Sequence, residues 1–233
     1  IRTLKKTVRW VVGIVLGVYI GTIVLLNIPN IQQAMSVFVA EELSEVLNTK
    51  VVIGRINMGL LNRIIIDDVL LDDQSGQEML KVTRLSAKFD IMPFFKGKIS
   101  ISSVQLFGFN INLRKETPDS PPNFKFVLDA FASKDTVKKE NSLDLRINSI
   151  LIRRGRMSYH VLSEEETPGK FNAKHIQLQN IIANISLKAL SKDSLNLGIK
   201  RLSLDEKASG FSLKKMSLKL VANNKQTNID NFT

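Results

Sequence analysis

The apolar residues of this chain alternate with polar ones, as in a β-strand, but the alternation repeatedly skips one position. In "ISISSVQL", residues 99–106, Ser102 and Ser103 stand together before the alternation resumes at Val104. Successive side chains of a strand point to opposite faces, so an extra residue would send the second apolar pair to the other face. A β-bulge would absorb the extra residue and restore the original face.

The same skip occurs eight times between residues 51 and 218. The intervals between copies are irregular, which indicates a repeated structural element and not a strict sequence repeat. The apolar positions of the eight copies are Val51-Ile53-Ile56-Met58, Ile64-Ile66-Val69-Leu71, Leu80-Val82-Leu85-Ala87, Ile99-Ile101-Val104-Leu106, Leu145-Ile147-Ile150-Ile152, Ile176-Leu178-Ile181-Ala183, Leu197-Ile199-Leu202-Leu204 and Phe211-Leu213-Met216-Leu218.

Strands of this kind predict a mainly β fold. Bulges increase the twist and coiling of a sheet, so the sheet should be strongly curved and apolar on one side. Short connections such as "DDQSGQ" at 72–77 and "DEKASG" at 205–210 favour a mostly antiparallel meander. Two alternatives stay open: each copy is two short strands joined by a turn, or the chain crosses between two sheets that close into a sandwich.

An uncharged apolar stretch, "WVVGIVLGVYIGTIVLLNI" at 10–28, precedes the first copy. As a helix it would be about 28 Å long, close to the hydrocarbon thickness of a bilayer. Its length argues against a cleaved signal peptide, and its basic flank argues against a buried core helix. The sequence therefore predicts a transmembrane helix that Pro29 ends, with these anchoring residues: Trp10, Ile14, Leu16, Tyr19, Ile23 and Leu26.

The charges around this stretch predict its orientation. Four cations precede it, and the first acidic residue of the chain is Glu41. By the positive-inside rule, the amino terminus lies in the cytoplasm and everything after Pro29 lies across the membrane. The four cations are Arg2, Lys5, Lys6 and Arg9.

The pattern divides the chain into five segments. The cytoplasmic tip and the membrane helix occupy residues 1–29. A connecting helix that caps the sheet occupies residues 30–50, and a first β segment occupies residues 51–113. Residues 114–142 are a Pro-rich loop with a short helix, and a second β segment occupies 143–233 and continues beyond this sequence. The short helix, "FKFVLDAFA", should place Phe124, Val127, Leu128 and Phe131 on one side and pack them on the apolar face; a sharper alternative is that it plugs a groove.

Composition narrows the function classes without selecting one. The 233 residues carry a net charge of +11, and four of these charges precede the membrane helix. The remaining cations are scattered along polar positions, which favours a solvated basic surface over a nucleic-acid site, with attraction to anionic lipid as a third alternative. The absence of cysteine excludes disulfides and thiolate metal sites.

Catalytic and cofactor motifs are absent from the sequence. There is no phosphate-binding loop, dinucleotide fingerprint, zinc-protease helix or serine elbow. The only histidines, His160 and His175, lack a metal-ligand spacing around them. The adjacent acids at 67–68 and 72–73 should point to opposite faces of a strand and form no acid–base pair. We therefore expect no enzyme, no metal and no cofactor.

Several stretches in order resemble the amino-terminal region of TamB-like proteins, which belong to the AsmA-like, bridge-like lipid-transfer group. The membrane helix and short helix are followed by "VVIGRINMGLLNRIIIDDVLLDDQSGQEMLKVTRLSAKFDIMPFFKGKISISSVQLFGFNINL". The later "NFKFVLDAF", "LDLRINSILIRRGRMSYHV" and "KHIQLQNIIANISLKALSKDSLN" resemble the Bacteroidota type. The resemblance covers nearly the whole chain, although each motif by itself is an apolar pattern with turns.

This resemblance implies an inner-membrane-anchored periplasmic bridge. Its curved sheet would form an elongated apolar groove, the β-taco, that carries phospholipids between the inner and outer membranes. The family is also tied to outer-membrane protein assembly with a TamA-like partner of the Omp85 class, so a scaffold role is the alternative. Further inner-membrane or periplasmic subunits are expected as partners, nucleic acid is not, and no catalytic residues carry over.

Of the apolar positions of the skip pattern, 21 are the expected lining of the groove for acyl chains. They are Ile53, Ile56, Ile64, Ile66, Val69, Leu71, Val82, Leu85, Ile99, Ile101, Val104, Leu106, Ile147, Ile150, Ile152, Leu178, Ile181, Ile199, Leu202, Leu213 and Met216. Two tripeptides, "DTV" and "DSL", are similar to the O-glycosylation sequence of Bacteroidota and make Thr136 and Ser194 candidates for that modification.

Overall fold

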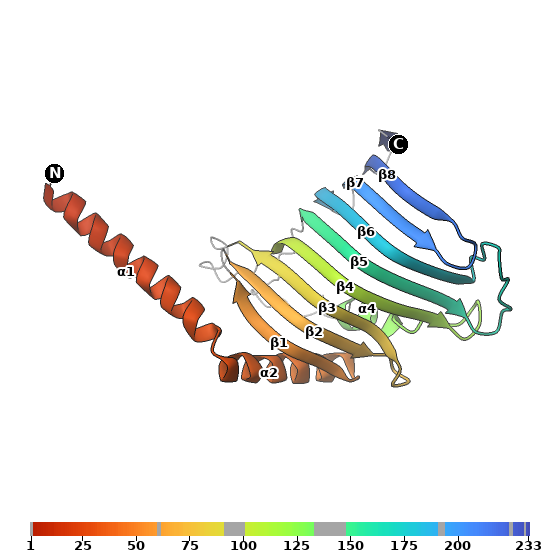
Figure 1. Cartoon of the computed structure of the whole chain (residues 1–233), viewed down its shortest axis with the longest axis horizontal. Helices are drawn as coiled ribbons and strands as arrows, with labels where there is room; N and C mark the ends of the chain where they lie inside the picture. Colours follow the sequence, from red (N-terminus) through yellow and green to blue (C-terminus); the bar gives the residue numbers. More distant parts are fainter. Residues whose placement is uncertain are drawn as a thin grey trace.

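The computed structural model describes residues 2–59, 62–90, 101–132, 148–190, 194–223, 226–230 and 232–233. Its described part is mainly β: nine strands form a single curved sheet, with two helices ahead of it (Figure 1). All neighbouring strands but one pair are antiparallel, as the sequence predicts. The chain therefore forms one sheet and no second sheet closes over it in the described residues.

Helix α1 (Arg2–Leu26) and helix α2 (Pro29–Leu47) are separated by a sharp break. Pro29 stands at the start of α2, where its missing N–H costs nothing, and it holds Ile28 in an extended conformation. Helix α2 ends at Asn48, which adopts a left-handed conformation with φ 48°. The N–H groups of Asn48 and Thr49 then donate to the carbonyls of Glu45 and Ser44, which satisfies the last turn.

The strands follow one another across the sheet in sequence order. Tight turns join several of them; in the turn between β2 and β3, for example, Gly76 has φ 75°. The strands are β1 (Val51–Gly59), β2 (Arg63–Asp72), β3 (Glu78–Phe89), β4 (Ile101–Lys115), β5 (Ser149–Val161), β6 (His175–Leu190), β7 (Ser194–Glu206), β8 (Ser212–Asn223) and β9 (Thr227–Asp230).

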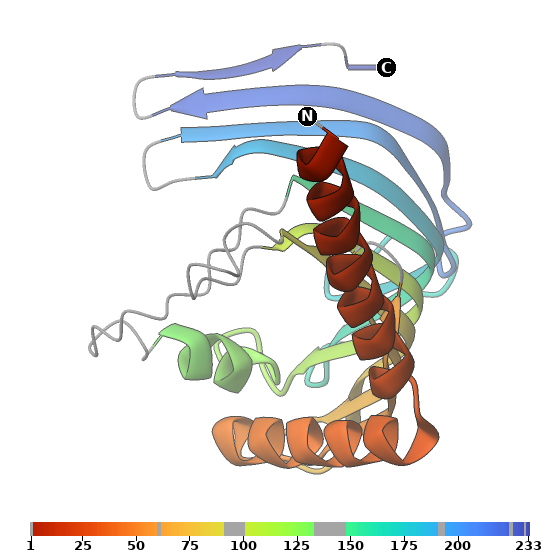
Figure 2. The same ribbon diagram turned by 90° about the vertical axis from the view of Figure 1, so that its left-hand side faces the viewer.

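Strands β4 and β5 are the one parallel pair, and the connection between them contains helix α4 (Lys125–Ala132). Figure 2 shows this helix on the concave side of the sheet, above α2. Phe124 and Val127 pack there as expected, together with Phe126 and Ala130. The expectation for Leu128 is wrong, because that side chain is 58% exposed. The side chain of Phe131 lies outside the described residues.

The skips of the first three strands lie at one level of the sheet. Ile53 pairs with Val69 and Arg55 pairs with Asp67, so the β1–β2 register is the same on both sides of the skip. The β2–β3 register is also unchanged there. The prediction of a bulge is wrong for these strands, because each neighbour carries the same extra residue and none is left over. A Cβ on Gly54 would lie only 2.9 Å from the Cβ of Asp68, which shows how closely the two skips face each other.

The bulge is confirmed at Ser102. Ser103 pairs with Lys88 but Ile101 pairs with Phe89, so Ser102 is the extra residue of strand β4. This strand then skips a second time, at residues 107–108, and β5 skips at residues 153–154, at the level where β1–β3 skip. Between β5 and β6, and between β7 and β8, the pairing register shifts at this level, which is the signature of a β-bulge.

Left-handed residues occupy this line of skips. They are Asp68, Gly108, Arg154 and Asn180, with φ between 54° and 64°. Because this conformation turns the chain, the strands bend where the skips align, and the sheet is curved, as Figure 2 shows.

A small core holds the bend together. Val82, Phe109 and Ile181 are buried at its centre, and neighbouring apolar residues from β2–β7 pack around them. Gly155 lies beneath the Phe109 ring: a Cβ at this position would come within 2.4 Å of two ring atoms and 3.0 Å of the Ile181 Cβ. The glycine therefore leaves the space that the aromatic ring fills.

We predict that Gly155→Ala destabilises the chain by about 1–3 kcal/mol, because the added methyl group overpacks this core. Gly198→Ala is the matched control on strand β7. Its Cβ would come within 2.7 Å of the Ser186 Oγ, a side-chain tip that can rotate away, and would lie 4.0 Å from the Ser186 carbonyl oxygen, which is an ordinary contact. Urea unfolding of the purified chain in detergent measures both changes, and equal effects would contradict the packing described for Phe109.

Candidate functional site

Two rows of apolar residues cross the sheet without interruption from β1 to β8. Each member pairs directly with the next, so no polar residue separates them along the row. The first row is Ile56, Ile66, Leu85, Leu106, Ile152, Ala183, Leu202 and Met216. The second row is Met58, Ile64, Ala87, Val104, Ile150, Ile185, Ile199 and Leu218.

Most of the predicted lining is half-buried, which is unusual for a closed core. Of the 19 predicted positions that the structure describes, five are buried, 14 are intermediate and none is exposed. Ile99 and Ile147 lie outside the described residues. Side chains sealed between two sheets would be buried throughout. The apolar face is therefore only partly covered by the described residues.

Some apolar residues of this face are not among the predicted positions; examples are Phe109, Ile111, Met157 and Ile185. In "LFGFNINL" the pattern skips at residues 107–108 and then alternates again, so a search for a second skip in each strand would have found Phe109.

Helices α2 and α4 cover the end of this face that lies nearest to β1. Leu47, Val51 and Ile56 are buried there, among side chains from both helices. The α2 residues that pack against them are Met35, Val39, Ala40 and Leu43, and the α4 segment contributes Phe124, Phe126, Val127 and Ala130. The second cluster, around Val82 and Phe109, consists of strand residues alone.

Asn123, just before α4, holds this helix in place. Its side-chain amide donates to the Asp73 carboxylate and to the Asn112 carbonyl, both at 3.1 Å, and its oxygen accepts from the Arg114 N–H at 3.0 Å. Asp73 is 2% exposed and also forms an ion pair with Arg114 at 2.7 Å. Burial acts to raise the pKa of Asp73, but hydrogen bonds from Ser75, Asn123 and Gln77 outweigh it, and the pKa is lowered.

Helix α1 is long and apolar enough to cross a membrane over Arg9–Leu26. Trp10 is 68% exposed, Ile14, Leu16 and Tyr19 are also exposed, and Ile23 and Leu26 are half-buried. Lys6 and Arg9 are exposed, whereas the side chains of Arg2 and Lys5 lie outside the described part. Exposed apolar side chains on a whole helix are consistent with a membrane anchor.

An apolar pocket of about 690 Å³ lies between α1 and the end of the sheet. Asn27 fixes this junction, because its amide donates to the carbonyls of Ile23 and Met58 at 2.7 and 3.0 Å. The α1 residues of the pocket are Val11, Val12, Val15, Leu16, Val18, Tyr19, Thr22 and Ile23, and the sheet contributes Met58, Gly59, Asn62 and Phe89. Met58 is also the first residue of the second apolar row, so the pocket adjoins that row.

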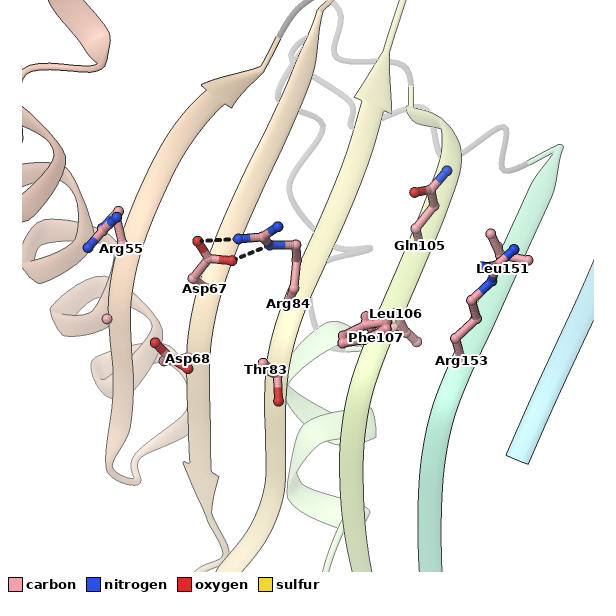
Figure 3. A pocket seen from close by; sticks show the side chains of 11 residues that line it. Arg55, Asp67, Asp68, Thr83, Arg84, Gln105, Leu106, Phe107, Leu151 and Arg153 are labelled. Carbon is pink, nitrogen blue, oxygen red and sulfur yellow. Dashed lines mark hydrogen bonds and ion pairs between the residues drawn. The ribbon is translucent and has the colours of Figure 1, made fainter. Parts of the chain in front are cut away.

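The convex face is different, since the skips place pairs of polar residues on it. Figure 3 shows Asp67 and Arg84 pointing toward each other on this face, with α4 behind the strands. Arg84 donates to the Asp67 carboxylate from two nitrogens, at 2.6 and 3.2 Å, and the hydrogen bond raises the pKa of Arg84. The hollow of about 810 Å³ around them also contains Arg55, Asp68 and Arg153.

The expectation that Asp67 and Asp68 point to opposite faces is wrong, because both line this convex hollow. The left-handed conformation of Asp68 explains why adjacent residues share a face. Asp67 forms an ion pair with Arg84. The hollow contains three arginines and two aspartates in all, so its positive and negative charges largely compensate one another. The convex hollow is therefore a weaker candidate site than the concave apolar face.

Glu206 ends β7 and organises the turn to β8. It is 2% exposed and accepts hydrogen bonds from the N–H groups of Gln177, Ala208 and Ser209 and from the Ser209 hydroxyl. Burial acts to raise the pKa of Glu206, but these hydrogen bonds lower it to about 2.

The structure does not describe the side chains of the two candidate O-glycosylation sites. Thr136 lies outside the described residues, and Ser194 begins strand β7 with a side chain that is not described. Comparison with known proteins adds no assignment: no family model matches the chain, and no curated protein matches it.

We predict that Asn123→Ala loosens α4 from the concave face. The variant loses two hydrogen bonds to buried groups and one acceptor, so it should destabilise the chain by about 1–3 kcal/mol. Hydrogen exchange of the amides of residues 125–132 should accelerate. Asp129→Asn, which removes only the exposed ion pair with Lys125, is the control and should leave this exchange nearly unchanged. Equal exchange in both variants would contradict the role of Asn123.

We predict a stability loss at acid pH that depends on Glu206. Because its pKa is depressed in the folded chain from 4.5 to about 2, its contribution is present above pH 4.5 and is lost as the pH falls toward 2. Glu206→Gln should lower stability at pH 7 by about 1–3 kcal/mol and flatten this acid dependence. Glu78→Gln, at an exposed position of β3, is the control for urea unfolding at pH 7 and pH 3. An unchanged slope in Glu206→Gln would contradict the prediction.

Proposed function

We propose that this chain is the membrane-anchored first part of a lipid-transfer bridge. The concave apolar face holds the acyl chains of phospholipids and carries them away from the membrane in which α1 is anchored. In this proposal the anchor lies in the inner membrane with its amino terminus in the cytoplasm, and the sheet lies in the periplasm.

The two uninterrupted apolar rows carry the proposal. A row of directly paired aliphatic side chains from β1 to β8 offers a continuous surface along which a hydrocarbon chain can move without meeting a polar group. Each CH₂ group that leaves water gains about 0.8 kcal/mol, so an exposed apolar trough favours acyl chains over solvent. The half-burial of the 14 lining positions leaves contact area for such a ligand.

The junction with α1 supports a route from the bilayer. The pocket between α1 and the sheet is lined almost wholly by apolar side chains, and it adjoins the second row at Met58. A lipid tail could pass from the bilayer to the sheet there without crossing water. The same order of anchor, capping helix and curved sheet is implied by the resemblance to TamB-like proteins.

A scaffold for outer-membrane protein assembly with a TamA-like partner is the competing proposal. It requires no lipid on the concave face, and substitutions there would leave transport of lipid unaffected. A face that only packs against other protein segments would likewise capture no lipid. The decisive measurement is therefore what contacts the concave face in cells.

Photo-crosslinking at adjacent residues of one strand makes this test. Val104 belongs to the second apolar row, whereas its neighbour Gln105 lines the convex hollow. A photoreactive amino acid at position 104 should capture phospholipid, which mass spectrometry identifies. The same photoreactive amino acid at position 105 should capture none. Leu202 on the first row and its neighbour Arg201 repeat the comparison on β7, farther from the membrane helix.

Capture at 104 and 202 but not at 105 and 201 is the expected result. Equal capture at the two members of each pair would indicate detergent-like, non-specific contact and would overturn the proposal. Protein crosslinks at 104 and 202 without lipid would favour the scaffold.

A further inference from the structure

The two histidines of the chain come together at one end of the sheet. His160 lies near the end of β5 and His175 begins β6, and the antiparallel register places them directly opposite each other. Their Nδ1 atoms are 3.0 Å apart, and the ring planes meet at 53°. Side chains of directly paired residues share a face, so the register itself produces this contact.

A hydrogen bond fixes how the His175 ring presents its nitrogens. Its Nε2 lies 2.9 Å from the carbonyl oxygen of Glu164, and this oxygen can only accept. Nε2 therefore carries the hydrogen, and in the neutral ring the lone pair is on Nδ1, the atom that faces His160. A backbone carbonyl on the far nitrogen is the usual support of a metal-ligating histidine.

Glu166 supplies a third donor from the turn between β5 and β6. Its Oε1 lies 3.7 Å from the His160 Nδ1 and 4.0 Å from the His175 Nδ1, and the three donor atoms all lie within 4.8 Å of one another. In the part of the chain that the structure describes, the histidines are the only basic groups within ion-pair distance of this carboxylate. The neighbouring Glu164 is instead paired with Lys174 at 2.6 Å.

The distances suit a divalent transition metal. Two nitrogens that both bind a tetrahedral zinc ion at about 2.0–2.1 Å lie roughly 3.3 Å apart, close to the observed separation. The carboxylate side chain is 64% exposed, so it has room to move closer to both nitrogens. Two imidazoles and one carboxylate leave a fourth position to water, a ligand set that suits zinc better than magnesium or calcium.

We propose that His160, His175 and Glu166 form a zinc site that fastens the turn at residues 162–174 to the ends of β5 and β6. His175 is 7% exposed and anchors the site, while the exposed Glu166 closes it from the turn. The ion links two neighbouring strands and their connecting turn, with water in the fourth position. This inference is independent of the proposed lipid transfer, because it rests on groups outside the two apolar rows.

Zinc titration of the full chain tests the proposal. The protein is purified in detergent with a tag free of histidine, treated with a chelator, and titrated with Zn²⁺ by calorimetry and with Co²⁺ by visible absorption. The wild type should bind one Zn²⁺ per chain, and the cobalt spectrum should be that of a four-coordinate ion. Zinc should also raise the unfolding temperature, because the ion binds only the folded chain.

Three variants make the result specific. His160→Phe keeps a ring of similar size and should abolish binding. Glu166→Gln should weaken Zn²⁺ affinity at least about tenfold, because the charged ligand is lost. Glu165→Gln, a neighbouring exposed glutamate outside the cluster, is the matched control and should bind as the wild type does.

Absence of saturable Zn²⁺ binding by the wild type would overturn the proposal. So would equal affinities in wild type and His160→Phe, which would place the ion elsewhere, or equal weakening in the Glu165 and Glu166 variants. Because Glu166 is exposed, its variant should keep the unfolding temperature of the metal-free wild type, which separates loss of zinc from loss of fold.

Discussion

The constraint on which this structure depends is that a strand can keep one face apolar after an extra residue only if its neighbour carries a matching extra residue or the residue is left out of the pairing as a bulge. In β1–β3 the neighbours do so by skipping together, and the register is unchanged. Left-handed residues, among them Asp68 and Gly108, make the turn of the backbone that this requires. The aligned skips bend the sheet, place paired polar residues such as Asp67 and Asp68 outside, and keep both apolar rows inside.

The sequence predicts the class of fold and much of the apolar face, because alternation is a local property that each strand displays by itself. The curved, mostly antiparallel sheet and the bulge at Ser102 follow from it. Register is not local. The pattern search assigned the β4 and β5 skips to residues 102–103 and 148–149, whereas the skips that align with the other strands are at 107–108 and 153–154. Phe109, at the centre of the core, was missed for this reason.

Contacts between segments that are distant in the sequence could not be predicted either, because they depend on how the strands pair and how the helix packs. Leu128 is exposed whereas Phe126 is packed, so the packed side of this short helix differs in part from the side that its apolar residues suggest. His160 and His175, 15 residues apart with no metal-ligand spacing, become neighbours only because β5 and β6 pair in one particular register. The need for glycine at position 155 could not be predicted for the same reason, since the ring that fills the space above it is that of Phe109 on another strand.

The parallel pairing of β4 with β5 has a consequence for how the chain reaches its structure. Strands β1–β4 form from contacts between sequence neighbours, so they need only small loops to close. Strand β5 pairs in parallel with β4 across a connection of residues 116–148, and closing this connection carries the entropy cost of a much longer loop. The first four strands can therefore pair with one another as a unit before β5 joins the sheet. Helix α4, which packs against α2 and β1, then covers the apolar surface that this early unit would otherwise expose.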